Sequence, residues 1–360
     1  MLRHSCRLLF ATLLACTATL VQAAPFAYIT NNAPIGTVSV IDTATNTVVA
    51  TVTVGASPVG VAVNPTGTRV YVVNGGSNNV SVIDTATNAV VATVGVGTNT
   101  RGVAVNPAGT RAYVTNSTDN TVSVIDTASN TVVATVPVGN GPYGVAINPA
   151  GTRAYVTNSS GNSVSVIDTT SNTVVATVAV GAGTVPLGVA VNPAGTRAYV
   201  VLQNTSNVSV IDTSSNTVLT TVAAGTQPRG VAFNPAGTRA YVTNIGSANV
   251  TVIDTASNTV VTTVLVGNNP VGVSVNPTGT RAYVANSGSN NVSAIDTTSN
   301  TVVATVAVGT NPEAFGLFIG PAAAVVGAVG PIPTLSQWGL LLLGVILAAL
   351  GVVRLRRLNS

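Results

Sequence analysis

A stretch that reads RAYVTNSTDNTVSVIDT, Arg111 to Thr127, returns along the chain with only a few changes in each copy. Seven copies align on a tyrosine near the start and an aspartate near the end, and successive aspartates lie 42 residues apart except for one step of 44. A fixed period of this length marks one supersecondary unit repeated in space, so the 360 residues count repeats rather than independent domains. The tyrosines are Tyr28, Tyr71, Tyr113, Tyr155, Tyr199, Tyr241 and Tyr283, and the aspartates are Asp42, Asp84, Asp126, Asp168, Asp212, Asp254 and Asp296.

Each copy predicts four short β-strands. In the third copy the β-branched runs are 112–116, 121–127, 131–138 and 143–149, and turn-forming residues separate them. Both faces of each strand are apolar or small, which suits sheets that are covered on both sides. Four-stranded units stacked face to face make a β-propeller. The alternative is a solenoid β-helix, whose coils are shorter and have fewer strands in each repeat.

The two ends of the array complement each other. The first copy begins at Phe26 without a GVAVNP-type strand, and the array ends with PEAFGLFIG, Pro312 to Gly320, which supplies that strand alone. Pairing of Ala314–Ile319 with Phe26–Thr30 would complete one blade and close the ring. We therefore expect an all-β fold over residues 24–320, a seven-bladed β-propeller of four-stranded antiparallel blades.

The N-terminal residues 1–23 have the features of a secretory signal peptide: a basic start, an apolar run and a small-residue cleavage site after Ala23. A second interpretation is a lipobox-like LLAC sequence that would lipidate Cys16. Both cysteines, Cys6 and Cys16, lie within this segment, so cleavage after Ala23 would leave an exported domain without disulfides.

The C-terminal end predicts a membrane anchor. Residues 321–331 form a linker, and residues 332–360 form a tail with a transmembrane helix over 338–353 and a basic end. The helix is short for a hydrocarbon core of about 30 Å, but Trp338 suits one interface and the terminal arginines suit the other. Because arginines are retained on the cytoplasmic side, the repeats would lie outside.

Charge gives no indication of nucleic-acid binding. All thirteen basic residues are arginines, and five of them lie in the two terminal segments. The repeats hold eight arginines against nine acidic residues, a net charge of −1. The basic excess of the whole chain therefore belongs to its ends.

Two resemblances follow from these motifs. YVTN followed by VSVIDT, TVVATV and GVAVNPAGTR, seven times from Phe26 to Gly320, resembles the YVTN-type propeller repeat of bacterial and archaeal surface proteins, which implies seven blades. The tail resembles the IPTL-type sorting signal of Gram-negative bacteria, with Gln337 where an acidic residue is frequent. That resemblance implies an exosortase-like processing enzyme, transient anchoring in the inner membrane and a destination at the cell surface. The motif residues are Ile332, Pro333, Thr334, Leu335, Ser336, Trp338 and Gly339.

A repeated arginine–aspartate pattern predicts structural ion pairs. In six copies an arginine after the NPAGT-type turn precedes the aspartate by 15 residues, which places both at one end of a hairpin. Asp42 is left without such an arginine. The alternative is that the aspartates form a catalytic or calcium-binding ring. The expected pairs are Arg69 with Asp84, Arg111 with Asp126, Arg153 with Asp168, Arg197 with Asp212, Arg239 with Asp254 and Arg281 with Asp296.

One set of positions varies where the rest of the repeat is constant. The residue before the glycine of the inner strand varies among six copies, and Glu313 is its counterpart in the last copy. These residues should surround one mouth of the central channel, beside the variable loops. Neutral variation on a solvated rim is the other interpretation. The candidate rim for a ligand or partner is Val59, Arg101, Tyr143, Leu187, Arg229, Val271 and Glu313.

The residue inventory argues against most enzyme chemistry. His4 is the only histidine and lies in the signal peptide, and lysine is absent, so the exported domain would lack histidine, cysteine and lysine. No cofactor motif is present, and Glu313 with Asp119 offers too few oxygen ligands for a metal site. We expect a non-catalytic surface module that recognises a protein or glycan through its variable loops. The alternative function is a lactonase-like hydrolase with an oxygen-ligand cation site, and a second mode of association is through the outer TVVATV strands.

Overall fold

The computed structural model describes residues 25–321. The predicted signal peptide, the sorting tail with its transmembrane helix and the linker after Pro321 lie outside these described residues. Within residues 25–321, no helix is long and apolar enough to cross a membrane.

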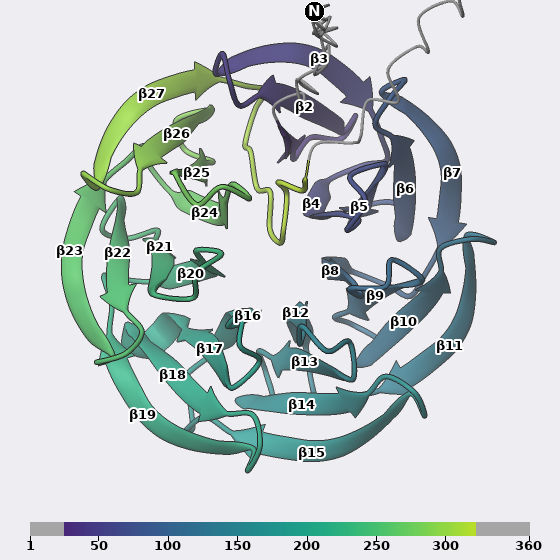
Figure 1. Cartoon of the computed structure of the whole chain (residues 1–360). Helices are drawn as coiled ribbons and strands as arrows, with labels where there is room; N and C mark the ends of the chain where they lie inside the picture. The colour runs from purple at the N-terminus through teal and green to yellow at the C-terminus, as the bar shows by residue number, and fades with distance from the viewer. Residues whose placement is uncertain (1–24, 322–360) are drawn as a thin grey trace, which may run out of the picture. The chain divides into compact units, whose positions relative to one another are not determined.

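Seven β-sheets surround a central channel, as Figure 1 shows, and this arrangement confirms the predicted all-β seven-bladed propeller. Six sheets have four antiparallel strands in sequence order from the channel outward, and the seventh has three. The innermost strands are β4 (Pro58–Val63), β8 (Thr100–Val105), β12 (Pro142–Ile147), β16 (Pro186–Val191), β20 (Pro228–Phe233) and β24 (Pro270–Val275). The second strands are β1 (Phe26–Asn31), β5 (Arg69–Asn74), β9 (Arg111–Asn116), β13 (Arg153–Asn158), β17 (Arg197–Leu202), β21 (Arg239–Asn244) and β25 (Arg281–Asn286).

The outer half of each blade is a second hairpin. The third strands are β2 (Thr37–Asp42), β6 (Asn79–Asp84), β10 (Thr121–Asp126), β14 (Ser163–Asp168), β18 (Asn207–Asp212), β22 (Asn249–Asp254) and β26 (Asn291–Asp296). The outermost strands are β3 (Thr47–Thr53), β7 (Ala89–Gly95), β11 (Thr131–Pro137), β15 (Thr173–Ala179), β19 (Thr217–Ala223), β23 (Thr259–Leu265) and β27 (Thr301–Ala307). One 3-10 turn, η1 (Gln203–Thr205), follows β17.

Every outermost strand contains a β-bulge. In β11, Ala134 pairs with Val124 and Val132 pairs with Ile125, so Val133 has no partner in the ladder. The same register shift occurs in each of the other blades. A bulge bends an edge strand and interrupts its pattern of free backbone groups. The repeated pair of valines in TVVATV is therefore also the site at which each blade resists edge-to-edge pairing.

The glycine that begins each GVAV-type run allows the innermost strands to approach one another. A Cβ atom on Gly102 would lie 2.5 Å from the carbonyl oxygen of Tyr143 in the next blade, and one on Gly144 would lie 2.4 Å from that of Leu187. Any larger residue would push the neighbouring backbone away. The glycine thus determines how narrow the channel is at this level.

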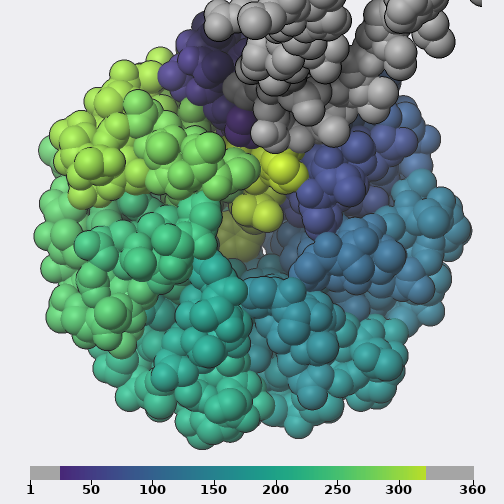
Figure 2. Space-filling view, viewed as in Figure 1, coloured from purple at the N-terminus to yellow at the C-terminus, as the bar shows by residue number. Residues whose placement is uncertain are grey.

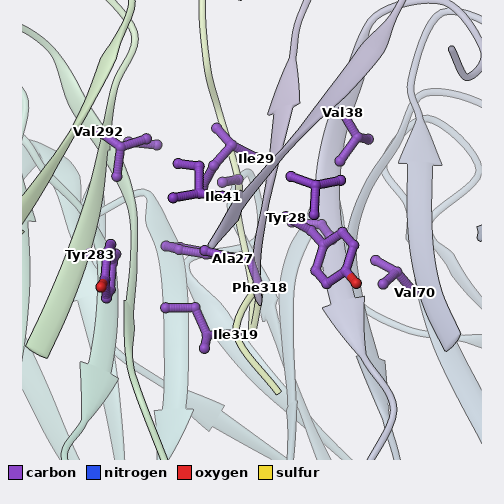
Figure 3. Close-up of a cluster of buried hydrophobic side chains, with 14 of the residues drawn as sticks. Ala27, Tyr28, Ile29, Val38, Ile41, Val70, Tyr283, Val292, Phe318 and Ile319 are labelled. Carbon is purple, nitrogen blue, oxygen red and sulfur yellow. The ribbon is translucent and has the colours of Figure 1, made fainter. Parts of the chain in front are cut away.

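The closing segment, residues 312–320, lies beside β1, as predicted. The amide of Tyr28 donates to the carbonyl of Phe318 at 3.0 Å, and the amide of Glu313 donates to the carbonyl of Thr30 at 2.9 Å. Phe318 and Ile319 are buried in a core with Ala27 and Tyr28 (Figure 3). The last segment and the first strand therefore share one hydrophobic core, which closes the ring.

The closing segment differs from the regular inner strands in its path. Two isolated bridges, Asn31 with Pro312 and Ala27 with Ile319, attach the closing segment to β1. In the next blade, β4 covers the equivalent part of β5 with two fewer residues between its first and last paired positions. The extra length bends toward the channel, where the amide of Val61 in β4 donates to the carbonyl of Phe315 at 3.0 Å. Gly316 has a φ of +128°, which favours glycine. The segment thus joins two blades.

The six predicted arginine–aspartate pairs lie in contact. In the third blade, Arg153 Nη1 lies 2.5 Å from Asp168 Oδ2, while Oδ1 of the same aspartate accepts the backbone amides of Thr170 and Ser171. The aspartate therefore connects the hairpin to the next turn, whose asparagine has a left-handed backbone (φ 55° at Asn172). Arg111–Asp126 and the other four pairs repeat this contact. Asp42 caps its turn in the same way, with no arginine partner among residues 25–321.

Replacing Phe318 with alanine should weaken the ring at its closure. We expect Phe318→Ala to lower the free energy of unfolding by about 3–5 kcal/mol, because a fully buried aromatic side chain is removed from the core shared with β1. Leu317→Ala is the matched control, since Leu317 is 57% exposed, and should cost about 1 kcal/mol or less. Chemical denaturation of both variants measures the difference, and equal losses would contradict this role of Phe318.

Acid should destabilise the propeller through its repeated aspartates. Backbone amides, that of Ser129 foremost, with Arg111 contributing, hold the pKa of Asp126 below its ordinary value, and the pKa values of the other five paired aspartates are also lowered. The unfolded chain thus binds protons more readily, so this stabilisation is complete above about pH 4 and is lost as the pH falls further. Thermal unfolding followed from about pH 7 to about pH 2 should give a level midpoint that then declines. A midpoint that stays level over the whole range would contradict this linkage.

Candidate ligand-binding mouth

The channel has two different ends. The innermost strands begin beside the variable loops, where the amide of Ser117 donates to the carbonyl of Asn99 and that of Ser159 donates to Gly141. We call this end the loop mouth. The opposite end, the turn mouth, is formed by the repeated NPAGT-type turns. The amide of Thr43, which follows the last residue of β2, donates to the carbonyl of Pro25, the first described residue. Pro321, the last described residue, lines the turn mouth. Both ends of the described chain therefore lie on this face.

Four of the seven predicted rim residues come together at the loop mouth. Arg101 in β8, Tyr143 in β12, Arg229 in β20 and Glu313 in the closing segment are linked by direct contacts. The other three are apolar and buried, and they do not contribute polar groups. Val59 and Val271 pack against Phe315, and Leu187 is buried in β16 between the strands of Tyr143 and Arg229.

Arg229 and Tyr143 form the centre of this group. Arg229 Nη2 donates to the Tyr143 hydroxyl at 2.6 Å and lies 3.3 Å from Glu313 Oε2. The guanidinium carbons of Arg101 and Arg229 lie 5.8 Å and 5.7 Å from the centroid of the Tyr143 ring, within the range of cation–π attraction. One tyrosine from a single blade therefore holds two cations that come from two other blades.

Neighbouring blades position Tyr143. The hydroxyl of Thr115 in β9 donates to the Tyr143 carbonyl at 2.7 Å, and the same hydroxyl accepts the amide of Gly102. The ring of Phe315 meets the Tyr143 ring edge to face, with centroids 5.2 Å apart. Phe315 is buried in the channel and was not predicted as a rim residue. Its signal was the AFGLF run, which breaks the GVAV pattern of the other inner strands.

The charge at the loop mouth is incompletely balanced. Burial acts to lower the pKa of the Arg229 guanidinium, but Tyr143 and Glu313 together raise that pKa above its ordinary value. The buried Nε of Arg229 has no hydrogen-bond partner within the described residues. Arg101 has no carboxylate partner within residues 25–321. Two arginines thus face one glutamate, and the surplus positive charge favours an anionic group.

The two acidic residues that were weighed as cation ligands have other partners. Glu313 lies against Arg229, and Asp119 accepts the backbone amide and the hydroxyl of Thr98. No group of three or more histidine, cysteine, aspartate or glutamate residues suited to a metal occurs in the part of the chain that the structure describes.

The fold defines a seven-bladed β-propeller, and comparisons with known proteins agree with that class. The family described as "Lactonase, 7-bladed beta-propeller" matches residues 83–222, and the IPTL-CTERM motif matches residues 331–357. No curated protein matches significantly. The chain carries the IPTL-CTERM motif, which indicates export and display at the cell surface. The lactonase match lies within the propeller and covers less than half of the chain.

Solved structures share the fold. Hydrazine synthase from Kuenenia stuttgartiensis is similar with a TM-score of 0.66 and 24% identity over 71% of this chain and 88% of that one. A functionally unknown protein from Desulfotomaculum acetoxidans has a TM-score of 0.70 and 21% identity over 83% of this chain and 99% of that one. At these identities the likeness concerns the fold alone.

Arg229 should contribute to stability and Arg101 should not. We expect Arg229→Met to lower the free energy of unfolding by about 1–2 kcal/mol, because it leaves Glu313 and the Tyr143 hydroxyl without their partner. Arg101→Met should change it by less than about 0.5 kcal/mol. Urea unfolding of the two variants measures the contrast. An equal cost for both would mean that the contacts of Arg229 add nothing to the fold.

Proposed function

We propose that this protein is an exported, non-catalytic binding module that recognises an anionic ligand at the loop mouth. The observation that carries the proposal is the convergence of Arg101 and Arg229 on Tyr143 with only one glutamate to balance them. Carboxylate groups of acidic glycans or proteins match these donors in charge and geometry. The ligand is a molecule at the surface of a Gram-negative cell or in its surroundings.

The positions of the chain ends support display of the loop mouth. Both ends of residues 25–321 lie on the face of the repeated turns, opposite the variable loops. A tether that starts after Pro321 therefore leaves the loop mouth unobstructed by the attachment point. We propose that the tail anchors the chain in the inner membrane at least transiently and is then a substrate of an exosortase-like processing enzyme.

A panel of glycans tests the proposal. The exported chain, without residues 1–23, is screened against immobilised glycans that carry uronic or sialic acids and against their neutral counterparts. We expect binding to the acidic members, a decrease at high salt, and a loss of at least about tenfold in affinity for Arg101→Met, since a charge-assisted hydrogen bond contributes about 1.5–3 kcal/mol.

The control is the same substitution on the opposite face. Arg153→Met removes one positive charge from the turn face, because Arg153 starts β13 at the end of the blade opposite to Tyr143. Its affinity should equal that of the unmodified chain. If Arg153→Met weakens binding as much as Arg101→Met does, the attraction is a general charge effect and the loop mouth is not the site. Absence of binding to every acidic glycan and to acidic peptides would refute the proposal.

The second candidate function is a lactonase-like hydrolase, which the family match over residues 83–222 favours. Its chemistry would need an activated water, and the two carboxylates weighed as cation ligands, Glu313 and Asp119, are already engaged by Arg229 and by Thr98. Hydrolysis of lactones by the same exported chain, measured with added Ca²⁺ and with Glu313→Gln, separates the two functions. Turnover that Glu313→Gln abolishes would favour the hydrolase.

A further inference from the structure

A second cavity occupies the opposite end of the channel. It opens at the turn mouth, has a volume of about 550 Å³ and is lined by all six regular inner strands and by the closing segment. Such a volume lies within the roughly 300–1,000 Å³ of ordinary ligand pockets. Phe315 and Gly316 line the narrow void of about 30 Å³ above it. Figure 2 shows the closing segment, in yellow, at the centre of the disc. We call this cavity the lower chamber.

The lining of the lower chamber contains no charged residue. Valine, isoleucine, leucine, phenylalanine, alanine, proline and glycine form it, apart from Asn64 and Asn234. Both asparagines are engaged in their own turns: Asn64 Oδ1 accepts the amides of Thr68 and Arg69, and Asn234 Oδ1 accepts the amide of Arg239. The side chains of the chamber thus offer apolar contact area with no charged group and no unpaired asparagine carbonyl, which suits an apolar ligand.

Two residues in the chamber depart from the repeat toward larger apolar surfaces. Phe233 is the last residue of β20, where the other regular inner strands end in valine or isoleucine. Its ring packs against the ring of Tyr199, with the two centroids 4.9 Å apart. Leu317 is 57% exposed and lies in the extra length of the closing segment. Burial of the exposed part of this side chain would be favourable, because it removes apolar surface from water. An apolar occupant of the chamber would provide that burial.

The position of the chamber indicates which apolar molecule reaches it. Pro321 lines the chamber, and the chain continues from there to the IPTL-CTERM motif at residues 331–357 and the apolar run 340–353. The described chain thus ends at this mouth, and the apolar run of the proposed anchor follows it in sequence. We propose that the lower chamber binds one long acyl chain, with the polar end of the lipid left outside at the proline rim.

A fluorescent fatty acid tests the chamber directly. The exported chain, without residues 1–23, is titrated with cis-parinaric acid, whose emission rises when its chain leaves water. We expect saturation at one molecule per chain and at least about a tenfold loss of affinity for Leu317→Glu, which places a charge in the apolar lining. Because Leu317 is exposed, this variant should retain the unfolding midpoint of the unmodified chain.

The matched control is Leu265→Glu, which makes the same change on the outermost strand β23, where the leucine is 77% exposed. It should leave the affinity unchanged. If Leu265→Glu weakens binding as much as Leu317→Glu, or if neither variant does, the probe binds the outer strands or the tail and the chamber proposal is overturned. Arg101→Met should also leave probe binding intact, so a failure here is independent of the loop mouth.

A second experiment determines whether the acyl chain belongs to a phospholipid or to a free fatty acid. Native mass spectrometry after incubation with phosphatidylcholine vesicles should detect one phospholipid retained by the unmodified chain and none by Leu317→Glu. Retention of parinaric acid without phospholipid, with the same dependence on Leu317, supports a free fatty acid as the source. Retention of neither ligand contradicts the proposal.

Discussion

Ring closure is the constraint on which the rest of this structure depends. Six blades are complete in themselves, but the first has three strands and needs residues 312–320 from the other end of the chain. Phe318 and Ile319 enter the same core as Ala27 and Tyr28, and the core extends to both neighbouring blades. A contact between residues so distant in sequence is entropically costly to form, and burial of the Phe318 ring offsets part of that cost.

Repeated and non-repeated residues have separate tasks in the ring. The repeated glycines, aspartates and arginines lie within blades or between adjacent blades, where they determine spacing and turn geometry. The residues that break the pattern lie in the channel. Arg101, Tyr143 and Arg229 form a charged group at the loop mouth, whereas Phe233 and Leu317 line an apolar chamber at the turn mouth. The two ends of one channel therefore differ in chemistry, and Phe315 lines the narrow void between them.

The fold was predictable because its information is local and repeated. The 15-residue spacing placed Arg153 and Asp168 at one hairpin end, and the hairpin register puts these two residues directly opposite each other. The bulge in every outer strand and the inward bend of the closing segment were not predicted. Both features depend on which residues of two strands pair with each other. The letters TVVATV are compatible with a regular strand and with a bulged one, so the sequence alone does not indicate the bulge. Of the candidate rim, the positions followed from alignment, but the burial of Val59, Leu187 and Val271 did not.

The sequence by itself determined the number of blades, the order of strands, the site of closure and the pairing of repeated charges, because each is a property of one repeat or of the two ends of the array. Only the tertiary structure decided which unrepeated residues meet. Arg229 and Tyr143 are separated by 86 residues and come from blades that are not adjacent, so their contact depends on the curvature of the ring and on the rotamers that Phe315 permits. The lower chamber likewise exists because the six inner strands and the closing segment surround one axis. The width of the space between them is set by the folded ring and cannot be read from the repeat period.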